Sequence, residues 1–309
     1  MGWVNVARRL REMGILGINR RNAACILDHN PRAAYPIVDD KLRLHRLCAT
    51  VGVPTPAIYT VIQRYSELSQ LPDRLAGYDD FVVKPNRGSG GRGILVVVGR
   101  DGNRFQRVNR SWLDFDDMRR HVADTLSGLY SLGGRPDTAL VQQRVRVHPA
   151  LSAISFQGVP DVRVIVYRGQ PAMAMLRLPT RKSGGRANLH QGGIGVGIDL
   201  ASGTTHHAVR SNRFIASHPD TEASLIGVRV PAWDDILAMA CRVASAVGLG
   251  YLGVDIVIDA TNGPLLLEAN ARPGLAIQIA NATGLRSCLD MIDARLAHNS
   301  PSKLLEQAA

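Results

Sequence analysis

Residues 251–275 constrain the fold of this chain more than any other stretch. Their sequence, YLGVDIVIDATNGPLLLEANARPGL, holds two short aliphatic runs separated by Asn-Gly at 262–263, a strong signal for a hairpin turn. Three oxygen-bearing side chains, Asp255, Glu268 and Asn270, lie within these runs. Because a carboxylate inside an apolar strand is costly unless something pairs with it, these residues need a partner.

The two strands of such a hairpin bring the three polar side chains together. Glu268 and Asn270 are two residues apart and point to the same face, and Asp255 lies on the neighbouring strand. Two carboxylates and one amide oxygen on one face form a set of hard oxygen ligands suited to Mg²⁺. The alternative is an isolated surface hairpin with solvated acids, but the surrounding aliphatic residues favour a buried one.

The composition is that of a soluble protein with one large or two modest domains. The chain has 309 residues, 45% of them hydrophobic and 20% charged. No apolar run approaches the ~18 residues of a membrane helix, and the N-terminus lacks an apolar signal core. We therefore expect a cytoplasmic protein with no membrane partner. The cysteines show no CxxC pair, which predicts reduced core thiols, and they are Cys25, Cys48, Cys241 and Cys288.

The net charge of +11 is compatible with nucleic acid, an acidic substrate or a phosphate-rich ligand. The basic residues are mostly arginine, since only four of the 37 are lysine. A lysine retained in such a chain indicates a place that needs a compact ammonium rather than a planar fork. Genomic base composition could produce the same bias.

One of these lysines, Lys41, opens a predicted helix over residues 39–52. Asp39 or Asp40 can cap this helix, and Gly52 ends it. A cation in the first turn opposes the helix dipole, so a phosphate ligand explains Lys41 better than helix stability does. An exposed lysine with no role is the alternative.

A second lysine, Lys84, ends a β-rich run and precedes a glycine-rich loop. The stretch 81–98 predicts two strands flanking this loop, whose backbone N–H groups can approach a polyphosphate because no Cβ blocks them. The pattern is neither a Walker loop nor a dinucleotide fingerprint, since a strand and not a helix follows. A flexible hairpin tip is the alternative. The loop residues we assign to phosphate binding are Arg87, Gly88, Ser89, Gly90 and Gly91.

A basic loop follows the central strands, which we expect over residues 140–145, 161–167 and 172–178. The loop contains no acid and could be a solvated tip, a nucleic-acid contact or a clamp on an anionic substrate. Its polar residues are Arg181, Lys182, Arg186, Asn188 and His190.

The remaining elements frame this region. An amphipathic helix with a basic face is expected within residues 1–20. Further helices are expected over 111–132, 231–247 and 283–297, and residues 205–228 are expected to form a polar loop.

Taken in order, the lysine helix, VVKP with its glycine loop, VQQRV, DVRVIV, SGGRANLHQGG, GVDIV and LLLEANARPG resemble the ATP-grasp superfamily. The likeness is greatest to the branch of α-L-glutamate-ligase-like enzymes related to the ribosomal-protein glutamate ligase, and it covers about residues 38–292. It implies an α+β fold in which two α+β lobes clasp ATP. It also implies ATP and Mg²⁺ as cofactors, with two ions expected and Mn²⁺ able to replace them.

The resemblance assigns roles residue by residue. Relatives usually carry Gln-Glu-aromatic at the adenine hinge, where this chain has Gln142-Gln143-Arg144. The implied phosphate and adenine contacts are Lys41, Lys84, Arg87, Gly88, Ser89, Gly90, Gly91, Gln142, Gln143 and Val145. The implied metal ligands are Asp255, Glu268 and Asn270. The implied residues near the γ-phosphate and the reacting carboxylate are Arg163, Arg186 and Asn188.

The same resemblance implies a domain division. We expect a short N-terminal segment over 1–37, a first ATP-grasp lobe with its lid over 38–139, a second lobe with the metal site over 140–297, and a tail over 298–309. Glutamate ligases of this type usually carry a complete α/β domain before the lysine helix, so the N-terminal segment is expected to be truncated. An uncovered lobe with an apolar helix stripe predicts a homo-oligomer.

The implied reaction is ADP-forming ligation of a carboxylate to an amine through an acyl phosphate. We expect an amino acid, with glutamate as first candidate, and an acidic carboxylate or peptide acceptor. The main alternative is a non-catalytic, basic nucleic-acid or partner-binding protein on an ATP-grasp frame. The chain has only five Phe, seven Tyr and three Trp, which disfavours a stacking platform for single strands. Another alternative keeps the acyl phosphate and uses a thiol acceptor.

Overall fold

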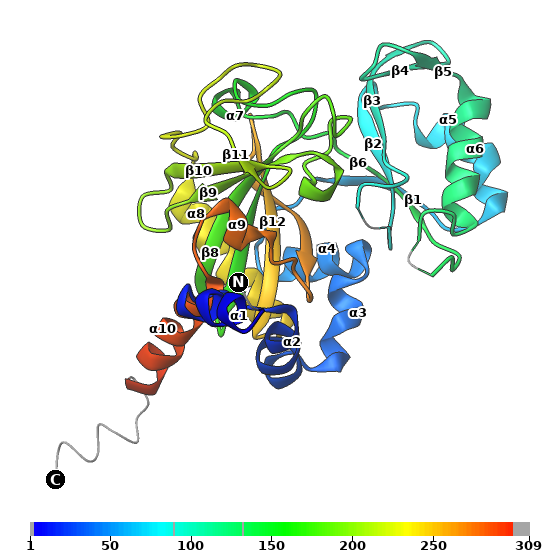
Figure 1. The fold of residues 1–309 in the computed structure, drawn as a ribbon. Helices are drawn as coiled ribbons and strands as arrows, with labels where there is room; N and C mark the ends of the chain where they lie inside the picture. Colours follow the sequence, from blue (N-terminus) through cyan, green and yellow to red (C-terminus); the bar gives the residue numbers. More distant parts are fainter. Residues whose placement is uncertain (1–2, 89, 132, 299–309) are drawn as a thin grey trace.

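The computed structural model describes residues 3–88, 90–131 and 133–298, and these residues form two antiparallel sheets with flanking helices (Figure 1). The smaller sheet and its helices lie to one side of a larger body built on the second sheet (Figure 1). Serine 89, assigned above to phosphate binding, and the tail from residue 299 lie outside the described residues.

The smaller sheet comes from the middle of the chain. Its strands, in spatial order, are β1 (Ile58–Ile62), β6 (Ala139–Gln142), β2 (Phe81–Pro85), β3 (Leu95–Asp101), β4 (Arg104–Arg107) and β5 (Trp112–Leu113). One face packs against η3 (Tyr65–Gln70), α5 (Leu71–Arg74) and α6 (Phe115–Leu126). Met118 and Val122, four residues apart on α6, are fully buried against Phe81 and Val97.

The larger sheet holds most of the second half of the chain. Its strands, in spatial order, are β11 (Arg213–Phe214), β10 (Thr205–Arg210), β9 (Ile194–Ile198), β8 (Gln170–Leu178), β7 (Asp161–Tyr167), β12 (Tyr251–Asp259) and β13 (Gly263–Asn270). The helices that accompany it are α7 (Pro149–Ser152), η4 (Leu189–Gln191), α8 (Trp233–Val247), α9 (Ala276–Ala280) and α10 (Leu285–His298).

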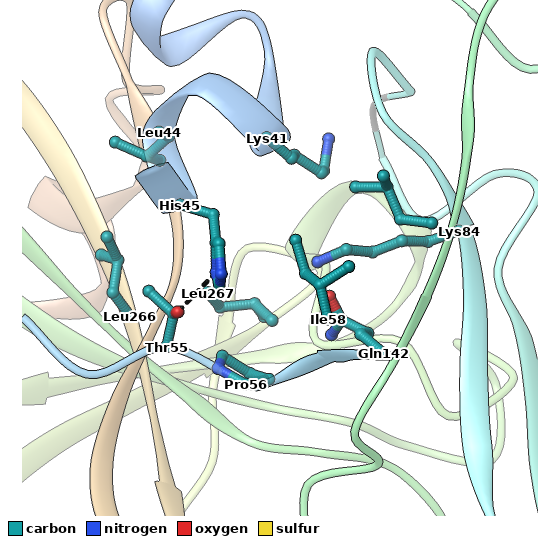
Figure 2. A pocket seen from close by; sticks show the side chains of 11 residues that line it. Lys41, Leu44, His45, Thr55, Pro56, Ile58, Lys84, Gln142, Leu266 and Leu267 are labelled. Atoms are coloured by element: carbon teal, nitrogen blue, oxygen red, sulfur yellow. Dashed lines mark hydrogen bonds between the residues drawn. The ribbon is translucent and has the colours of Figure 1, made fainter. Parts of the chain in front are cut away.

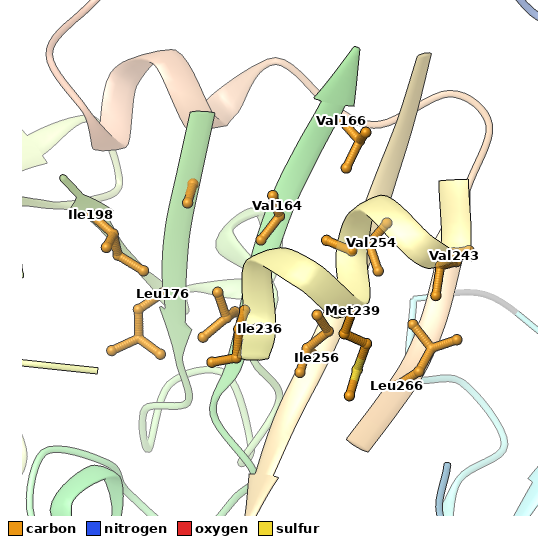
Figure 3. Packing of buried hydrophobic residues seen from close by; sticks show 14 of the residues in the cluster. Val164, Val166, Leu176, Ile198, Ile236, Met239, Val243, Val254, Ile256 and Leu266 are labelled. Carbon is orange, nitrogen blue, oxygen red and sulfur yellow. The ribbon is translucent and has the colours of Figure 1, made fainter. Parts of the chain in front are cut away.

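Both faces of this sheet are covered, which explains the continuous burial of its central strands. On β7, Val164 points to the core beneath α8, where Ile236 and Met239 pack (Figure 3). The next residue, Ile165, belongs to the core on the opposite face, under α9 and α10. Each fully buried aliphatic side chain of this kind contributes about 1.5–3 kcal/mol.

The hairpin predicted from its Asn-Gly turn is present as β12 and β13. Asp255 pairs with Glu268, and Ile256 pairs with Leu266, so one extra residue, Leu267, forms a bulge between them. The bulge lets Leu266 face the core beneath α8 while Glu268, two residues later, faces the other side of the sheet with Asp255.

The N-terminal residues form short helices that lie against the larger body. They are α1 (Trp3–Glu12), α2 (Ile18–Arg20), η1 (Arg21–Leu27), η2 (Arg32–Ala34), α3 (Tyr35–Val38) and α4 (Lys41–Thr50). The side chain of Asn30 fastens them, because it donates to the carbonyls of Tyr251 and Ala271 and accepts from the N–H of Tyr251. As predicted, an aspartate caps α4: Asp40 accepts from the N–H of Arg43.

The boundary expected between residues 139 and 140 falls inside β6, which is paired with β1 and β2 throughout. Helix α4, expected in the first lobe, contributes Leu44 and Cys48 to the core beneath α8. The chain therefore crosses between the two bodies more than once, and the division into lobes stays a proposal.

The prediction of a polar loop over residues 205–228 is wrong for its first part. Residues 205–210 form β10 and residues 213–214 form β11, because Ala208 and Val209 are buried and the two preceding histidines hydrogen-bond to residues 280 and 281. The helix expected over 111–132 spans only 115–126, since β5 precedes it. No helix among the described residues is long and apolar enough to cross a membrane.

Candidate active site

A pocket lies where the smaller sheet meets α4 and the β12–β13 hairpin (Figure 2). It takes its walls from both bodies. The residues that line it are Lys41, Leu44, His45, Thr55, Pro56, Ile58, Lys84, Leu140, Gln142, Leu266 and Leu267. The pocket thus joins two lysines and one glutamine of the predicted nucleotide site to apolar side chains that could enclose a planar ring.

Lys84 is the buried cation of this pocket. Only 7% of the residue is exposed, and no carboxylate is hydrogen-bonded to it among the described residues. Burial, reinforced by the charge of Lys41 and partly opposed by Glu268, lowers the pKa of Lys84 to about 7. A buried ammonium without a matching anion is the arrangement expected where an anionic ligand binds.

Lys41 connects the start of α4 to the glycine loop and to the hairpin. Its Nζ donates to the carbonyl of Gly88 at 2.8 Å and lies 3.6 Å from Oε1 of Glu268. Asn86 holds the two segments together, because its Oδ1 accepts from the N–H of Leu42 and its carbonyl accepts from the N–H of Lys41. The side chain of Lys41, which opposes the helix dipole, is therefore held by the glycine loop on one side and the hairpin on the other.

The glycine loop between β2 and β3 reaches across to the basic loop that follows β8. Gly90 and Gly91 have positive φ angles of 64° and 74°, which favour glycine. The carbonyl of Gly90 accepts from Nε2 of Gln191 at 3.1 Å. A Cβ on Gly91 would lie 3.2 Å from Cδ of Arg186. At the loop's base, the N–H of Arg87 donates to Asp137.

The three predicted metal ligands are neighbours on the hairpin, but Asp255 is already engaged. Arg163 donates through Nε to Oδ1 at 2.7 Å and through Nη2 to Oδ2 at 2.5 Å, and Nη2 of Arg177 lies 2.8 Å from Oδ2. Asn270 turns its Nδ2 toward the same Oδ2, at 3.3 Å. Glu268 is one-third exposed, and Lys41 is its only ion-pair partner among the residues that the structure describes.

These contacts form a row of charges across four strands. Arg177 lies opposite Asp161, and Arg163 opposite Asp255, which in turn lies opposite Glu268. Burial raises the pKa of Asp255, but the two arginines outweigh that effect and hold it below its usual value. Burial dominates at Asp161 and raises its pKa to about 6, although Arg177 opposes the change.

The donor set fits Mg²⁺ in type and placement, with one restriction. Glu268 keeps its oxygens apart from any arginine, and Oδ1 of Asp255 accepts a single hydrogen bond, which leaves lone pairs for a cation. Asn270 has to turn its amide oxygen toward the site in place of its nitrogen. Within the described ranges no group of three or more His, Cys, Asp or Glu is arranged to hold a metal ion, so a site here would also need the amide oxygen of Asn270.

The other residues assigned from sequence lie around this centre. Arg186 is exposed beside the glycine loop, and Asn188 uses its Oδ1 to cap the turn at residues 189–191. Gln143 is bonded to Ala57 at the edge of β1, and Val145 is buried in a small apolar cluster with residues 257 and 265. Of the predicted adenine contacts, only Gln142 lines the pocket itself.

Two residues near the site were not predicted from the sequence. Arg177 sits in an aliphatic strand as Glu268 does, so the same reasoning about buried charge could have found it. His45 follows Lys41 by one helical turn, and its Nδ1 lies 2.7 Å from the hydroxyl of Thr55. Burial, together with the charges of Lys84 and a neighbouring arginine, lowers the pKa of His45.

Residues 20–294 match the family model described as sugar-transfer associated ATP-grasp. The chain belongs to that family. An ATP-grasp fold accounts for the two α+β bodies and for the pocket between them, as the resemblance implied.

Curated relatives are similar over most of the chain. A probable alpha-L-glutamate ligase of Xanthomonas oryzae pv. oryzae (strain MAFF 311018) is 28% identical over 246 residues, which cover 80% of this chain and 61% of the relative. A cyanophycin synthetase of Crocosphaera subtropica is 23% identical and covers 96% of this chain and 35% of its own length. The chain therefore spans less than two thirds of the length of either relative.

Two solved structures are reported for comparison. The ATP-grasp ligase PsnB with minimal precursor, Mg and ADP aligns at a TM-score of 0.48 and 17% identity, over 87% of this chain and 61% of that chain. D-cycloserine synthetase DcsG aligns at 0.47 and 18%, over 86% and 73%.

Proposed function

We propose that this chain is an ADP-forming ligase that joins a carboxylate to an amine at the expense of MgATP. One observation carries the proposal: the pocket between the two bodies is lined by two lysines, one of them buried, beside a hairpin that presents two carboxylates. The membership of the ATP-grasp family and the ligase names of the relatives support the same reaction type.

In this proposal the lysines and the glycine loop bind the phosphates. Lys84 reaches them from the floor of the pocket and Lys41 from the start of α4, where it already bonds the loop at Gly88. The loop from Arg87 to Gly93 supplies backbone N–H groups above them. These cations are required because the attacking carboxylate and the triphosphate repel each other.

Glu268, Asp255 and Asn270 would hold the magnesium, which screens the phosphate charges and orients the γ-phosphoryl group. Arg163 and Arg177 fix the position of Asp255 beforehand, because their guanidinium groups occupy one side of its carboxylate. Gln142 lines the pocket near the apolar side chains that would enclose adenine.

The reaction then runs in two steps. The substrate carboxylate attacks the γ-phosphorus, the bond to the β,γ-bridging oxygen breaks, and ADP leaves. The amine next attacks the acyl phosphate and expels inorganic phosphate, leaving an amide. In this proposal Arg186 and Asn188 would hold a carboxylate or the transferring phosphoryl group; the proximity of Arg186 to the glycine loop supports this role.

We propose an acidic acceptor, with glutamate as the first amine to test. The exposed basic side chains of the loop after β8, among them Lys182 and Arg186, would attract an anionic substrate. Part of this charge is balanced in the fold, because Arg181 lies 3.7 Å from Asp220, an acid 39 residues further along the chain. The name of the Xanthomonas relative gives glutamate its priority.

The decisive experiment measures ADP release over pairs of amino acids and acidic or neutral carboxylates with MgATP. Acidic pairs should react fastest, and their kcat/KM should fall as salt screens the site. A preference for lysine as the amine or for neutral acceptors would refute the proposal of glutamate and an acidic acceptor, and would leave the proposal of a ligase intact. Nucleotide binding without turnover on any pair would favour a non-catalytic ATP-grasp protein.

A further inference from the structure

Helix α1 lies at the end of the molecule away from the smaller sheet (Figure 1). The side chains described in it, those of residues 5, 6 and 8–12, are exposed. Val6, Leu10 and Met13 follow the spacing of one helical face. They are 42%, 44% and 60% exposed. A solvent-exposed apolar face of this kind needs a partner, because a ten-residue helix is marginally stable in water by itself.

The contacts described between this segment and the core lie beyond the C-terminal end of α1. The carbonyl of Gly14 accepts from the N–H of Arg286 on α10, and the N–H of Leu16 donates to Gln278. Leu16, two residues past Gly14, is buried in the core, whereas the apolar side chains before Gly14 are exposed. Before Gly14, Val6, Leu10 and Met13 remain substantially exposed.

The charge around this face is strongly positive. Residues 3–32 contain six arginines and two acids, Glu12 and Asp28. Arg8, Arg9 and Arg11 are exposed on the polar side of α1. Ile18 on α2, 60% exposed, is a further exposed apolar side chain just past the anchor. A basic helix with an apolar face is typical of segments that lie on membrane surfaces.

We propose that α1, together with Ile18, docks this protein on an anionic lipid bilayer. The helix would lie in the headgroup plane, with Leu10 and Met13 entering the acyl boundary and the arginines contacting lipid phosphates. This differs from a membrane span, and it departs from our expectation that the chain has no membrane partner. It does not depend on the proposed ligase activity.

Two other occupants fit the surface less well. In a dimer formed through α1, the arginines of one copy would lie beside those of the other, and like charges placed side by side repel. A nucleic acid would pair with the arginines and leave the apolar row in water. An anionic bilayer satisfies both sides of the helix at once.

The test is cosedimentation of the full chain with vesicles of phosphatidylcholine, with and without one-third phosphatidylglycerol. Binding should require phosphatidylglycerol and should weaken strongly from about 0.1 M to about 1 M NaCl, as the Debye length falls from ~10 Å to ~3 Å. Replacing Arg8, Arg9 and Arg11 by Gln should weaken partition about fivefold per arginine.

The apolar contribution is tested by Leu10→Asp. This variant should reduce binding at least about tenfold, since it replaces an apolar side chain that would enter the bilayer by a charged one. Leu129→Asp is the matched control, because Leu129 is 63% exposed on the smaller body and should leave binding unchanged. Thermal unfolding should be unaffected by either substitution.

Absence of binding to the anionic vesicles would overturn the proposal, as would equal binding to neutral ones or an unchanged Leu10→Asp variant. Sedimentation equilibrium adds a further arm. A dimer that dissociates in Leu10→Asp, combined with no vesicle binding, would assign the surface to a second copy of the chain.

Discussion

Replacing Lys84 by Met should make the protein more stable and remove nucleotide binding. Lys84 is 7% exposed, and its pKa is lowered from an ordinary 10.5 to about 7, chiefly by burial. That difference corresponds to at most about 5 kcal/mol of destabilisation when the group is charged. Methionine fills a similar volume without the charge, so most of this cost disappears in the variant.

The pH dependence has a definite sign. Below about pH 7 Lys84 is protonated in both the folded and the unfolded chain, and the folded state carries the full cost of the buried charge. Between about 7 and 10.5 the folded state releases its proton first, so the contribution of Lys84 to stability rises with pH. The advantage of Lys84→Met should therefore be largest at or below pH 7 and should vanish near pH 10.5.

The size of the effect is measurable by heat or urea. For 309 residues, 1 kcal/mol shifts Tm by about 1.5 °C, so the variant should melt up to about 7 °C higher at pH 7. Lys182→Met is the matched control, because Lys182 is exposed and the same substitution there should leave Tm within about 1 °C.

Nucleotide binding gives a second readout of the same group. Phosphates beside Lys84 should restore the pKa of its ammonium, so ATP binding at pH 8 should take up about one proton, which titration calorimetry in buffers of different ionisation enthalpy counts. Lys84→Met should bind weakly and take up none. An unstabilised variant, or a wild type that binds ATP without proton uptake, would refute the reasoning.

Three further outcomes are expected. Glu268→Gln should keep the fold and lower kcat/KM at least tenfold, about 1.4 kcal/mol, and turnover within threefold at saturating Mg²⁺ would contradict the metal assignment. Asp255→Asn should cost about 3–5 kcal/mol in urea unfolding, since Arg163 and Arg177 lose their shared counter-charge; a loss under ~1 kcal/mol would show that the row is not coupled. Hydrogen exchange across residues 87–93 should slow with MgATP, because phosphates give the loop's N–H groups partners, and unchanged protection would count against the phosphate site.

The hairpin was predictable from sequence because local signals agreed. Asn262-Gly263 fixes the turn, and the aliphatic runs on either side demand burial, so the pairing of Asp255 with Glu268 followed. Strand β10 was not predicted because His206 and His207 are adjacent polar residues that interrupt the alternation of polar and apolar side chains. Its neighbour β9 was missed because it is rich in glycine: a Cβ on Gly197 would lie 2.6 Å from the carbonyl of residue 280.

The candidate site was predictable in its residue types and not in its contacts. Asp255 was assigned to a metal, yet it is held by arginines 92 and 78 residues away in sequence, and no local pattern reveals such partners. The two lysines were found because they are rare and stand at element ends. The salt bridge between Arg181 and Asp220 could not be predicted for the same reason as the contacts of Asp255, because its partners are 39 residues apart in the sequence.

The bulge at Leu267 means that this one residue can be removed without changing the other pairs of the hairpin. Without this residue, Glu268 would follow Leu266 directly, and every pairing from 253 with 270 to 259 with 263 would run in an unbroken ladder. Leu266 would still face the core beneath α8, and Glu268 would still face the other side of the sheet. What would be lost is one wall of the pocket, since Leu267 lines it beside Leu266. A chain shortened by this one leucine should thus retain its architecture while enclosing a planar ligand less tightly.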